Sequence, residues 1–239
     1  MSMAVLVLRL AGPLQSWGVS SKFNIRESGT EPSKSGVIGM VAAALGRRRG
    51  DSIEDLAALR FGVRRDQPGT VTRDFHMAHV PPEAHTKESS FVTTRFYIED
   101  AIFVAALEGD RELLEKADRA LRSPTFPLFL GRRSCPPTGP VTLGVRDESL
   151  EDVLFCLEWQ ASRWYRDRCG DSVALETVID SQNGSCETPD QPVSFDVHRR
   201  VHRRRTSVRS VNGTVVSNPH SCDVPGTSHD ALSALREED

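Results

Sequence analysis

Paired cysteines and long hydrophobic runs are both missing from this 239-residue sequence. Its five cysteines are scattered, odd in number and never in C-x-x-C spacing, so we expect free thiols in a reducing compartment and neither a disulfide framework nor a structural zinc site. No hydrophobic run approaches membrane-spanning length. The N-terminus, MSMAVLVLRLAG, has too short an apolar run and no basic leader for a signal peptide. These features predict a cytoplasmic protein with no membrane segment.

An overall excess of positive charge is also absent, since 30 Lys and Arg face 33 Asp and Glu for a net charge of −3. Domains that bind nucleic acid are often strongly basic, so any such site here must be local. Arginines do cluster, at 47–49, 64–65, 132–133 and 199–205. One cluster is more often a solvated face than a binding site, but four of them favour a local basic surface.

The stretch from Leu10 to Gly46 joins an expected strand, 4–10, to an expected helix through a polar loop. Ser33 or Ser35 is the predicted N-cap of that helix, and Lys34 lies in its first turn. A helix start offers free N–H groups and a positive dipole end, and here it also carries a cation. Phosphate is therefore the first ligand to consider.

The same stretch does not match a nucleotide-binding P-loop. In GTEPSKS, Ser33 stands where G-x-x-x-x-G-K-[ST] requires its second glycine, and about two dozen residues separate the strand from the lysine. This mismatch argues against a bound nucleotide but not against the phosphates of another polymer. The loop before the helix holds side chains that could stack on a base or bond to its edges, although a single tryptophan is more often a core or lid residue.

The order of expected elements indicates an α+β fold. Strands are expected at 61–65, 101–107, 126–130 and 141–145, an amphipathic helix at 110–121, and a long hairpin with strands 71–76 and 91–98. Helices on one face of a mostly antiparallel sheet fit a ferredoxin-like domain. Further on, we expect a helix or linker at 150–159, a strand at 173–179, a turn-rich connection at 180–192, a hairpin at 195–216 around Asn212-Gly213, and a disordered tail from 217.

Histidines do not form an evident metal or catalytic motif. His76, His79 and His85 lie in the expected hairpin without a matching cysteine or carboxylate spacing. His198 and His202 are four residues apart, but VHRRVHRRRTSV alternates like a strand and offers no third ligand. We therefore expect no metal and no cofactor.

Six motifs can be read together along the chain: LRLAGPLQSWG, PSKSGVIGMVAAALG, FGVRRDQPGT, DFHMAH, TTRFYIEDAIFVAALEG and PLFLGRRSCPP. In this order and spacing they resemble the CasD subunits of type I-E CRISPR Cascade, which belong to the RAMP superfamily. No single motif is diagnostic, but the ordered set is specific. The resemblance covers about residues 3–145 and continues more loosely through DQPVSFDVHRR.

The resemblance implies a ferredoxin-like (RRM-like) RAMP domain at 1–146 with a hairpin thumb at about 71–98, a smaller and mainly β portion at 147–216, and a tail at 217–239. It implies a non-catalytic subunit that grips the 5′ handle of the CRISPR RNA (crRNA). Such a subunit caps the filament of CasC backbone subunits, next to the large subunit CasA, and meets target DNA only through the complex. GRRS, residues 131–134, would be an RNA-facing loop.

These considerations give a predicted set of RNA-binding residues that supply cations for phosphate, donors for base edges and stacking surfaces. The set is Gln15, Ser16, Trp17, Arg26, Ser33, Lys34, Ser35, Arg64, Arg73, His76, Arg95, Arg132, Arg133 and Ser134. An alternative is a metal-independent endoribonuclease that processes the precursor RNA, because corresponding subunits of some CRISPR subtypes cleave it. His76 with Lys34 or Arg132 could then serve as base and cation.

Overall fold

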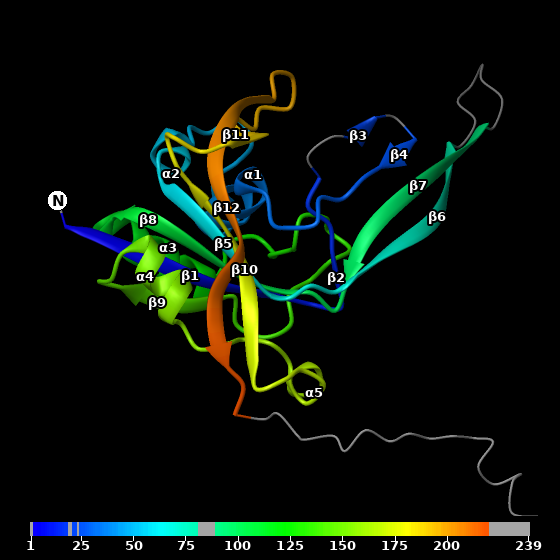
Figure 1. The fold of residues 1–239 in the computed structure, drawn as a ribbon. Coiled ribbons are helices and arrows are strands. Elements are labelled where there is room, and N and C mark those ends of the chain that lie inside the picture. The colour runs from blue at the N-terminus through cyan, green and yellow to red at the C-terminus, as the bar shows by residue number, and fades with distance from the viewer. Residues whose placement is uncertain (1, 19–20, 23, 81–88, 220–239) are drawn as a thin grey trace, which may run out of the picture.

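A computed structural model describes residues 2–18, 21–22, 24–80 and 89–219 of the chain (Figure 1). The fold is α+β and consists mostly of strands. Its main sheet has the order β11-β12-β10-β5-β8-β1-β9. Along the chain these strands are β1 (Met3–Ala11), β5 (Arg60–Gln67), β8 (Ile102–Asp110), β9 (Thr142–Arg146), β10 (Ser172–Asp180), β11 (Cys186–Ser194) and β12 (Val201–Ser217).

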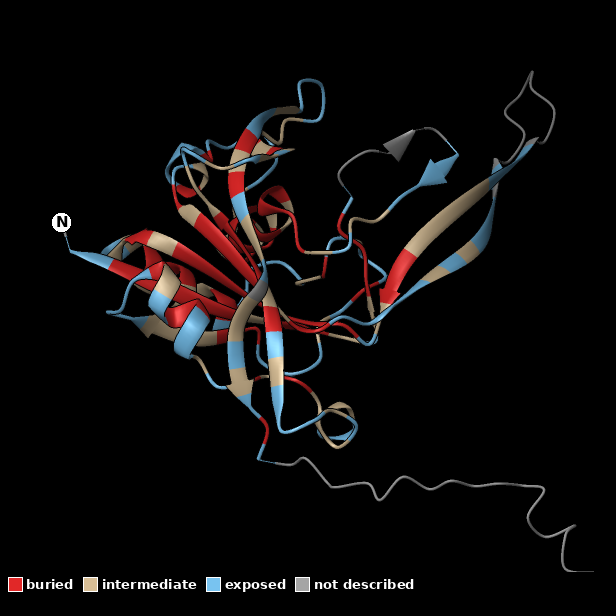
Figure 2. Cartoon of the chain, in the orientation of Figure 1, coloured by how far each residue is buried: buried red, intermediate tan, exposed pale blue. Residues whose placement is uncertain are grey.

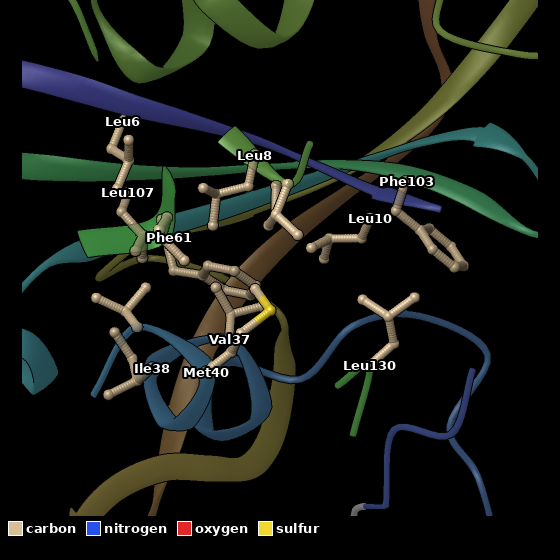
Figure 3. Packing of buried hydrophobic residues seen from close by; sticks show 14 of the residues in the cluster. Leu6, Leu8, Leu10, Val37, Ile38, Met40, Phe61, Phe103, Leu107 and Leu130 are labelled. Carbon is tan, nitrogen blue, oxygen red and sulfur yellow. The ribbon is translucent and has the colours of Figure 1, made fainter. Parts of the chain in front are cut away.

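The expected strand at 4–10 is confirmed as β1, which pairs antiparallel with β8 on one side and β9 on the other. Both of its faces are buried, because side chains alternate across a strand. Leu6, Leu8 and Leu10 join the core under helices α1 (Lys34–Ala44) and α3 (Arg111–Arg122). Figure 3 shows them facing Val37, Ile38 and Met40 of α1. Val5 and Val7 join a second core under α4 (Leu150–Cys156). The sheet is therefore covered on two faces, as the buried strands in Figure 2 show.

The two longer helices both begin at a side chain that caps them, and for α1 the cap is one of the two serines predicted. Ser33 caps α1 and accepts a hydrogen bond from the Gly36 N–H at 3.3 Å, and Gly46 follows the helix with φ +77°. Asp110 caps α3 in the same way. Two shorter helices, α2 (Glu54–Ala57) and α5 (Arg163–Arg166), complete the described set. Within the described residues, no helix combines the length and apolar character needed to cross a membrane.

The predicted hairpin is confirmed as β6 (Thr70–Val80) and β7 (Ser89–Glu99), which pair along their whole length and project from the body of the molecule (Figure 1). Short strands β2 (Leu14–Gln15), β3 (Ser21–Lys22) and β4 (Ile25–Arg26) complete this second sheet. Gly69, at φ +70°, makes the turn into β6, where a Cβ would overlap the Glu99 carbonyl oxygen. The hairpin tip, with His85, lies outside the described residues.

Three expectations about the later part of the chain are wrong. Residues 126–130 form no strand, because Pro127 interrupts the apolar run. Residues 180–192 are not only a connection, since β11 begins at Cys186 as an edge strand with register shifts around its prolines. Residues 195–216 do not form their own hairpin. Asn212-Gly213 lies in a bulge of the single long strand β12, which pairs with β10 and β11.

The C-terminal strands continue the main sheet, because β10 pairs with β5 over Glu176–Ile179. This pairing brings β11 and β12 beside the N-terminal end of α1, although more than 100 residues of sequence separate these strands from the helix. Of the predicted tail, only residues 217–219 lie within the described part of the chain.

Candidate nucleic-acid interface

Two adjoining cavities run along one side of α1, and we call them together the α1 groove. One has a volume of about 480 Å³ and the other about 510 Å³. Both are lined by Ser35, Gly36, Gly131 and Arg200, so they form one continuous depression. Residues from four separate segments therefore meet at this groove.

The first cavity brings together many of the predicted site residues. Its lining includes Ser16, Trp17, Arg26, Ser33, Ser35 and Arg132 from the predicted set, together with Asp190, Arg200 and His202 from the C-terminal strands. The predicted loop 131–134 reaches it because the Ser16 N–H donates to the Leu130 carbonyl at 3.0 Å. Gly131 adopts φ +85°, and a Cβ there would overlap the Ser16 carbonyl oxygen. Glycine at this position thus permits the close approach.

Arg132 joins three segments at the edge of the groove. Its guanidinium donates to the carbonyl oxygens of Phe96 at 3.1 Å and Arg26 at 2.7 Å, and lies 4.8 Å from the centre of the Tyr97 ring. Burial alone would raise the pKa of Tyr97, but hydrogen bonds with Ser134, Arg132 and Arg95 lower it overall. Arg132 is half-buried and engaged in these contacts, whereas Arg133 and Ser134 are exposed.

Lys34 belongs to a buried group of four charges. Its Nζ lies 3.1 Å from Asp180, and Arg205 contacts Asp180 at 2.6 Å and Asp190 at 2.9 Å. Burial lowers the pKa of Lys34, and Asp180 offsets part of that effect. Burial also opposes the charged form of Arg205, but its hydrogen bonds with Asp190 raise its pKa overall. Both cations are held by carboxylates of this chain.

The anion position at the start of α1 is occupied from within the protein. The backbone N–H of Lys34 donates to Asp190 Oδ2 at 2.8 Å, so this carboxylate sits where the helix dipole favours negative charge. The sequence predicted a phosphate at this position and Lys34 as its cation. The structure corrects that expectation, because both groups join α1 to β10 and β11.

Three other predicted residues are structural. Trp17 is completely buried and donates to Gln15 Oε1 at 3.0 Å, so neither face of its ring is open to a base. Gln15 is buried as well and donates to the carbonyls of Leu10 and Ala101. Arg64 is buried against Asp66 at 2.7 Å. These placements correct the expectation that the three side chains contact RNA directly.

The hairpin residues of the predicted set are not among the residues that line the groove. Arg73 and His76 are exposed on β6, and Arg95 is half-buried on β7. His76 is paired across the hairpin with Thr93, whereas Lys34 is buried at the start of α1. Of the two cations proposed to act with His76 in RNA cleavage, Lys34 is thus on another element and buried, whereas Arg132 donates to the Phe96 carbonyl on β7. In the described part of the chain, no group of three or more His, Cys, Asp or Glu could hold a metal ion.

The second cavity contains residues that the sequence did not single out as one site. Its lining includes Arg47, Arg48, Arg49, Arg133 and Arg200, with Phe126, Phe129 and Phe195 among them. Arg47 is paired with Asp55, and Arg48, Arg49, Arg133 and Arg200 are exposed. The arginine runs were visible in the sequence. The three phenylalanines come from two distant segments, and no spacing in the sequence connects them.

Comparison with known proteins identifies similar chains over most of this length. The family model described as "CRISPR-associated protein (Cas_Cas5)" matches residues 5–212. The CRISPR system Cascade subunit CasD of Escherichia coli (strain K12) is 34% identical over 156 residues, covering 58% of this chain and 70% of that protein.

Two solved structures are similar across nearly the whole fold. One, described as the crystal structure of a Cas protein, has a TM-score of 0.66 and 33% identity, and covers 91% of this chain and 97% of that chain. The other is a chain of a CRISPR RNA-guided surveillance complex. It has a TM-score of 0.74 and 30% identity, and the alignment covers 97% of each chain.

Proposed function

Because this chain belongs to the CRISPR-associated Cas5/CasD family, we propose that it is a non-catalytic subunit of a type I-E Cascade complex that grips the 5′ handle of the crRNA. It caps the filament of CasC backbone subunits and lies beside the large subunit CasA. Its contact with target DNA is made through the assembled complex. The similarity to a chain of a surveillance complex supports this assignment.

The observation that carries the proposal is the composition of the α1 groove. Single-stranded RNA is held by cations along its phosphates and by aromatic rings against its bases. The groove offers both, with exposed Arg48, Arg49, Arg133 and Arg200 beside three phenylalanines, of which Phe126 is exposed. The chain has a small negative net charge, but RNA binding requires only that this face be basic.

The topology supports a ferredoxin-like core within the α+β fold. The four strands β9-β1-β8-β5 are adjacent in the sheet, and the chain follows the order β1-α1-β5-β8-α3-β9. This is the β-α-β-β-α-β order of such folds. We assign this core, with its hairpin thumb, to residues 1–146 and the smaller β portion to 147–216.

The α1 groove accounts for part of the predicted RNA-binding set. Arg26, Arg132, Arg133 and the neighbouring Ser134 remain proposed contacts. Ser16, Ser33 and Ser35 line the groove but are buried, and the Ser16 and Ser33 hydroxyls bond to the Phe96 carbonyl and the Gly36 N–H of this chain. Arg73, His76 and Arg95 are proposed contacts of the hairpin.

An endoribonuclease function is the alternative, and the geometry gives it less support. General acid–base cleavage needs a base and a cation within reach of one phosphate. Lys34 is engaged with Asp180 at 3.1 Å and is not free to stabilise a pentacoordinate phosphate. Incubating the purified protein with labelled repeat RNA in EDTA tests this alternative. We expect intact RNA, and site-specific cleavage that is lost in His76→Ala would establish the enzyme instead.

The binding proposal is tested in the assembled complex with Arg133→Glu and Arg200→Glu combined. The matched control is Arg146→Glu, an exposed arginine on edge strand β9 that does not line the groove. We expect the double variant to retain less crRNA after a salt wash. The slope of log retention against log salt concentration should become shallower by roughly 0.7 for each phosphate that an arginine no longer neutralises. Equal retention by the double variant and the control would refute the groove assignment.

A further inference from the structure

The outer edge of the projecting hairpin is an unpaired strand edge. Among the described residues, β6 pairs only with β7, over Thr70–Val80 and without a register shift. Figure 1 shows the hairpin extending away from the main sheet, and β7 lies between β6 and the short strand β4. The free N–H and C=O groups along such an edge can pair with another strand.

The hydrogen bonds of β7 show which groups of β6 point outward. The Thr94 N–H donates to the Asn24 carbonyl at 2.8 Å, so it points away from β6. Thr94 lies opposite Phe75, and two opposite residues that are not bonded to each other in an antiparallel ladder direct their N–H and C=O groups apart. The N–H and C=O of Phe75 therefore face the free edge, and by alternation so do those of Arg73 and Met77.

The two edges of the main sheet are protected against such pairing, whereas β6 is not. Strand β11 contains Pro189 and Pro192 and has register shifts beside them, and β9 is only five residues long. Prolines, bulges and short length are common ways in which proteins block an edge strand. Strand β6 has 11 residues, no proline and no register shift. Its edge therefore carries none of these protections.

The side chains beside this edge differ between the two faces of the hairpin. Phe75 and Met77 lie on one face and are 66% and 46% exposed, and Val92, opposite Met77 on β7, adds to the same apolar face. Asp74 and His76 lie on the other face. An exposed apolar row next to free backbone groups is typical of a surface that another strand covers.

The residue pattern along β6 favours a second copy of this chain as the partner. When a twofold axis relates two antiparallel strands, one residue lies opposite its own copy, and that residue defines the register. With Arg73 or Asp74 at this position, two like charges would face each other. With Phe75 there, the two aromatic rings are neighbours and each Asp74 lies opposite the other copy's His76. The edge is therefore complementary to itself in the register centred on Phe75.

We propose that the chain, when free of other partners, forms a twofold dimer in which β6 pairs antiparallel with β6 of a second copy, centred on Phe75. The outward N–H and C=O groups of Arg73, Phe75 and Met77 bond across the interface, so β6 and β7 of both copies form one continuous sheet. An interface of this small size is weak, and we expect a micromolar Kd. In the dimer, His76 lies against the other copy's Asp74 and is not free to contact RNA.

Sedimentation equilibrium of the purified full chain without RNA tests the proposal. We expect a monomer–dimer equilibrium, and Phe75→Lys should raise the dimer Kd roughly tenfold or more, because it removes the central aromatic pair and places two like charges opposite each other. Val215→Lys is the matched control, because Val215 is also 66% exposed but lies on β12, and its Kd should be unchanged. A parent chain that is monomeric at about 100 µM, or a dimer equally stable in Phe75→Lys, would overturn the proposal.

Cysteine crosslinking tests the register independently. Opposite residues that exchange hydrogen bonds in an antiparallel pair have Cα atoms about 5.5 Å apart, which is within the reach of a disulfide. Phe75→Cys should therefore link two chains under mild oxidation, well above the level given by the cysteines of the parent chain. Thr94→Cys is the matched control on the same face, because β6 of both copies separates the two Thr94 positions by about 14 Å. Crosslinking of Phe75→Cys no greater than that of Thr94→Cys would overturn the proposal.

Discussion

Replacing Asp190 with alanine removes the carboxylate that joins α1 to β12. Asp190 accepts the Lys34 N–H at 2.8 Å and two hydrogen bonds from Arg205, at 2.9 and 3.0 Å. The Arg205 side chain is 6% exposed and that of Asp190 2% exposed. After the substitution, Arg205 keeps only Asp180, at 2.6 Å, and the helix start loses its anion.

The expected loss of stability follows from these contacts. Removing one partner of a buried ion pair costs about 3–5 kcal/mol, because it leaves the other charge without compensation. Because Asp180 remains next to Arg205, we expect a cost near the lower end of this range. Losing the anion at the positive end of the α1 dipole costs about 0.5 kcal/mol more. We therefore expect Asp190→Ala to lower the free energy of unfolding by about 3–4 kcal/mol. For a chain of this size, that corresponds to a decrease in Tm of roughly 10 °C.

Urea unfolding, followed by both tryptophan fluorescence and circular dichroism, measures the loss, and coincident transitions justify a two-state fit. Glu187→Ala is the control. It breaks the Arg204–Glu187 pair, whose side chains are 75% and 55% exposed, and should cost less than about 1 kcal/mol. Adding Arg205→Met to Asp190→Ala should recover part of the loss, since the uncompensated charge is then gone. If Asp190→Ala cost no more than Glu187→Ala, the stabilising role of the four buried charges would be refuted.

Two further predictions concern α1 and His202. Gly36→Ala should lower the free energy of unfolding by about 1–3 kcal/mol, because the added Cβ would lie 2.8 Å from the Trp17 ring. The added Cβ of Gly39→Ala meets only Phe195, at 3.8 Å, so this substitution should raise the free energy of unfolding by up to about 1 kcal/mol. Urea unfolding measures both. An equal effect of both substitutions would contradict this packing. Burial, and then the neighbouring Arg200, lower the pKa of His202 below 6.5, and Asp190 opposes this effect. The folded state therefore favours the neutral imidazole. Stability that is present above pH 6.5 should be lost as the pH falls through the pKa of the folded state. The urea midpoint should therefore drop less between pH 7.5 and 5 in His202→Gln than in the parent chain, and an identical drop would contradict the pKa direction.

Local patterns in the sequence were sufficient for most elements of the fold. Apolar runs gave β1 and β8, a serine cap gave the start of α1, and amphipathic periodicity gave α3. Two β-prone runs on either side of a polar stretch gave the hairpin. These signals act over a few residues, through capping and side-chain periodicity. Prediction failed for β11 and β12, because their pairing depends on partners far away in the sequence.

The sequence by itself determined which groups could bind an anion, but only the tertiary structure decided which of them are free to do so. Lys34 and the start of α1 are suited to phosphate by their chemistry alone. Asp190, 156 residues further along the chain, occupies that position, and Asp180 pairs with the lysine. Exposed arginines and phenylalanines from other segments instead line the groove. Burial and charge pairing depend on which segments the sheet brings together, and that information is not contained in any local stretch of residues.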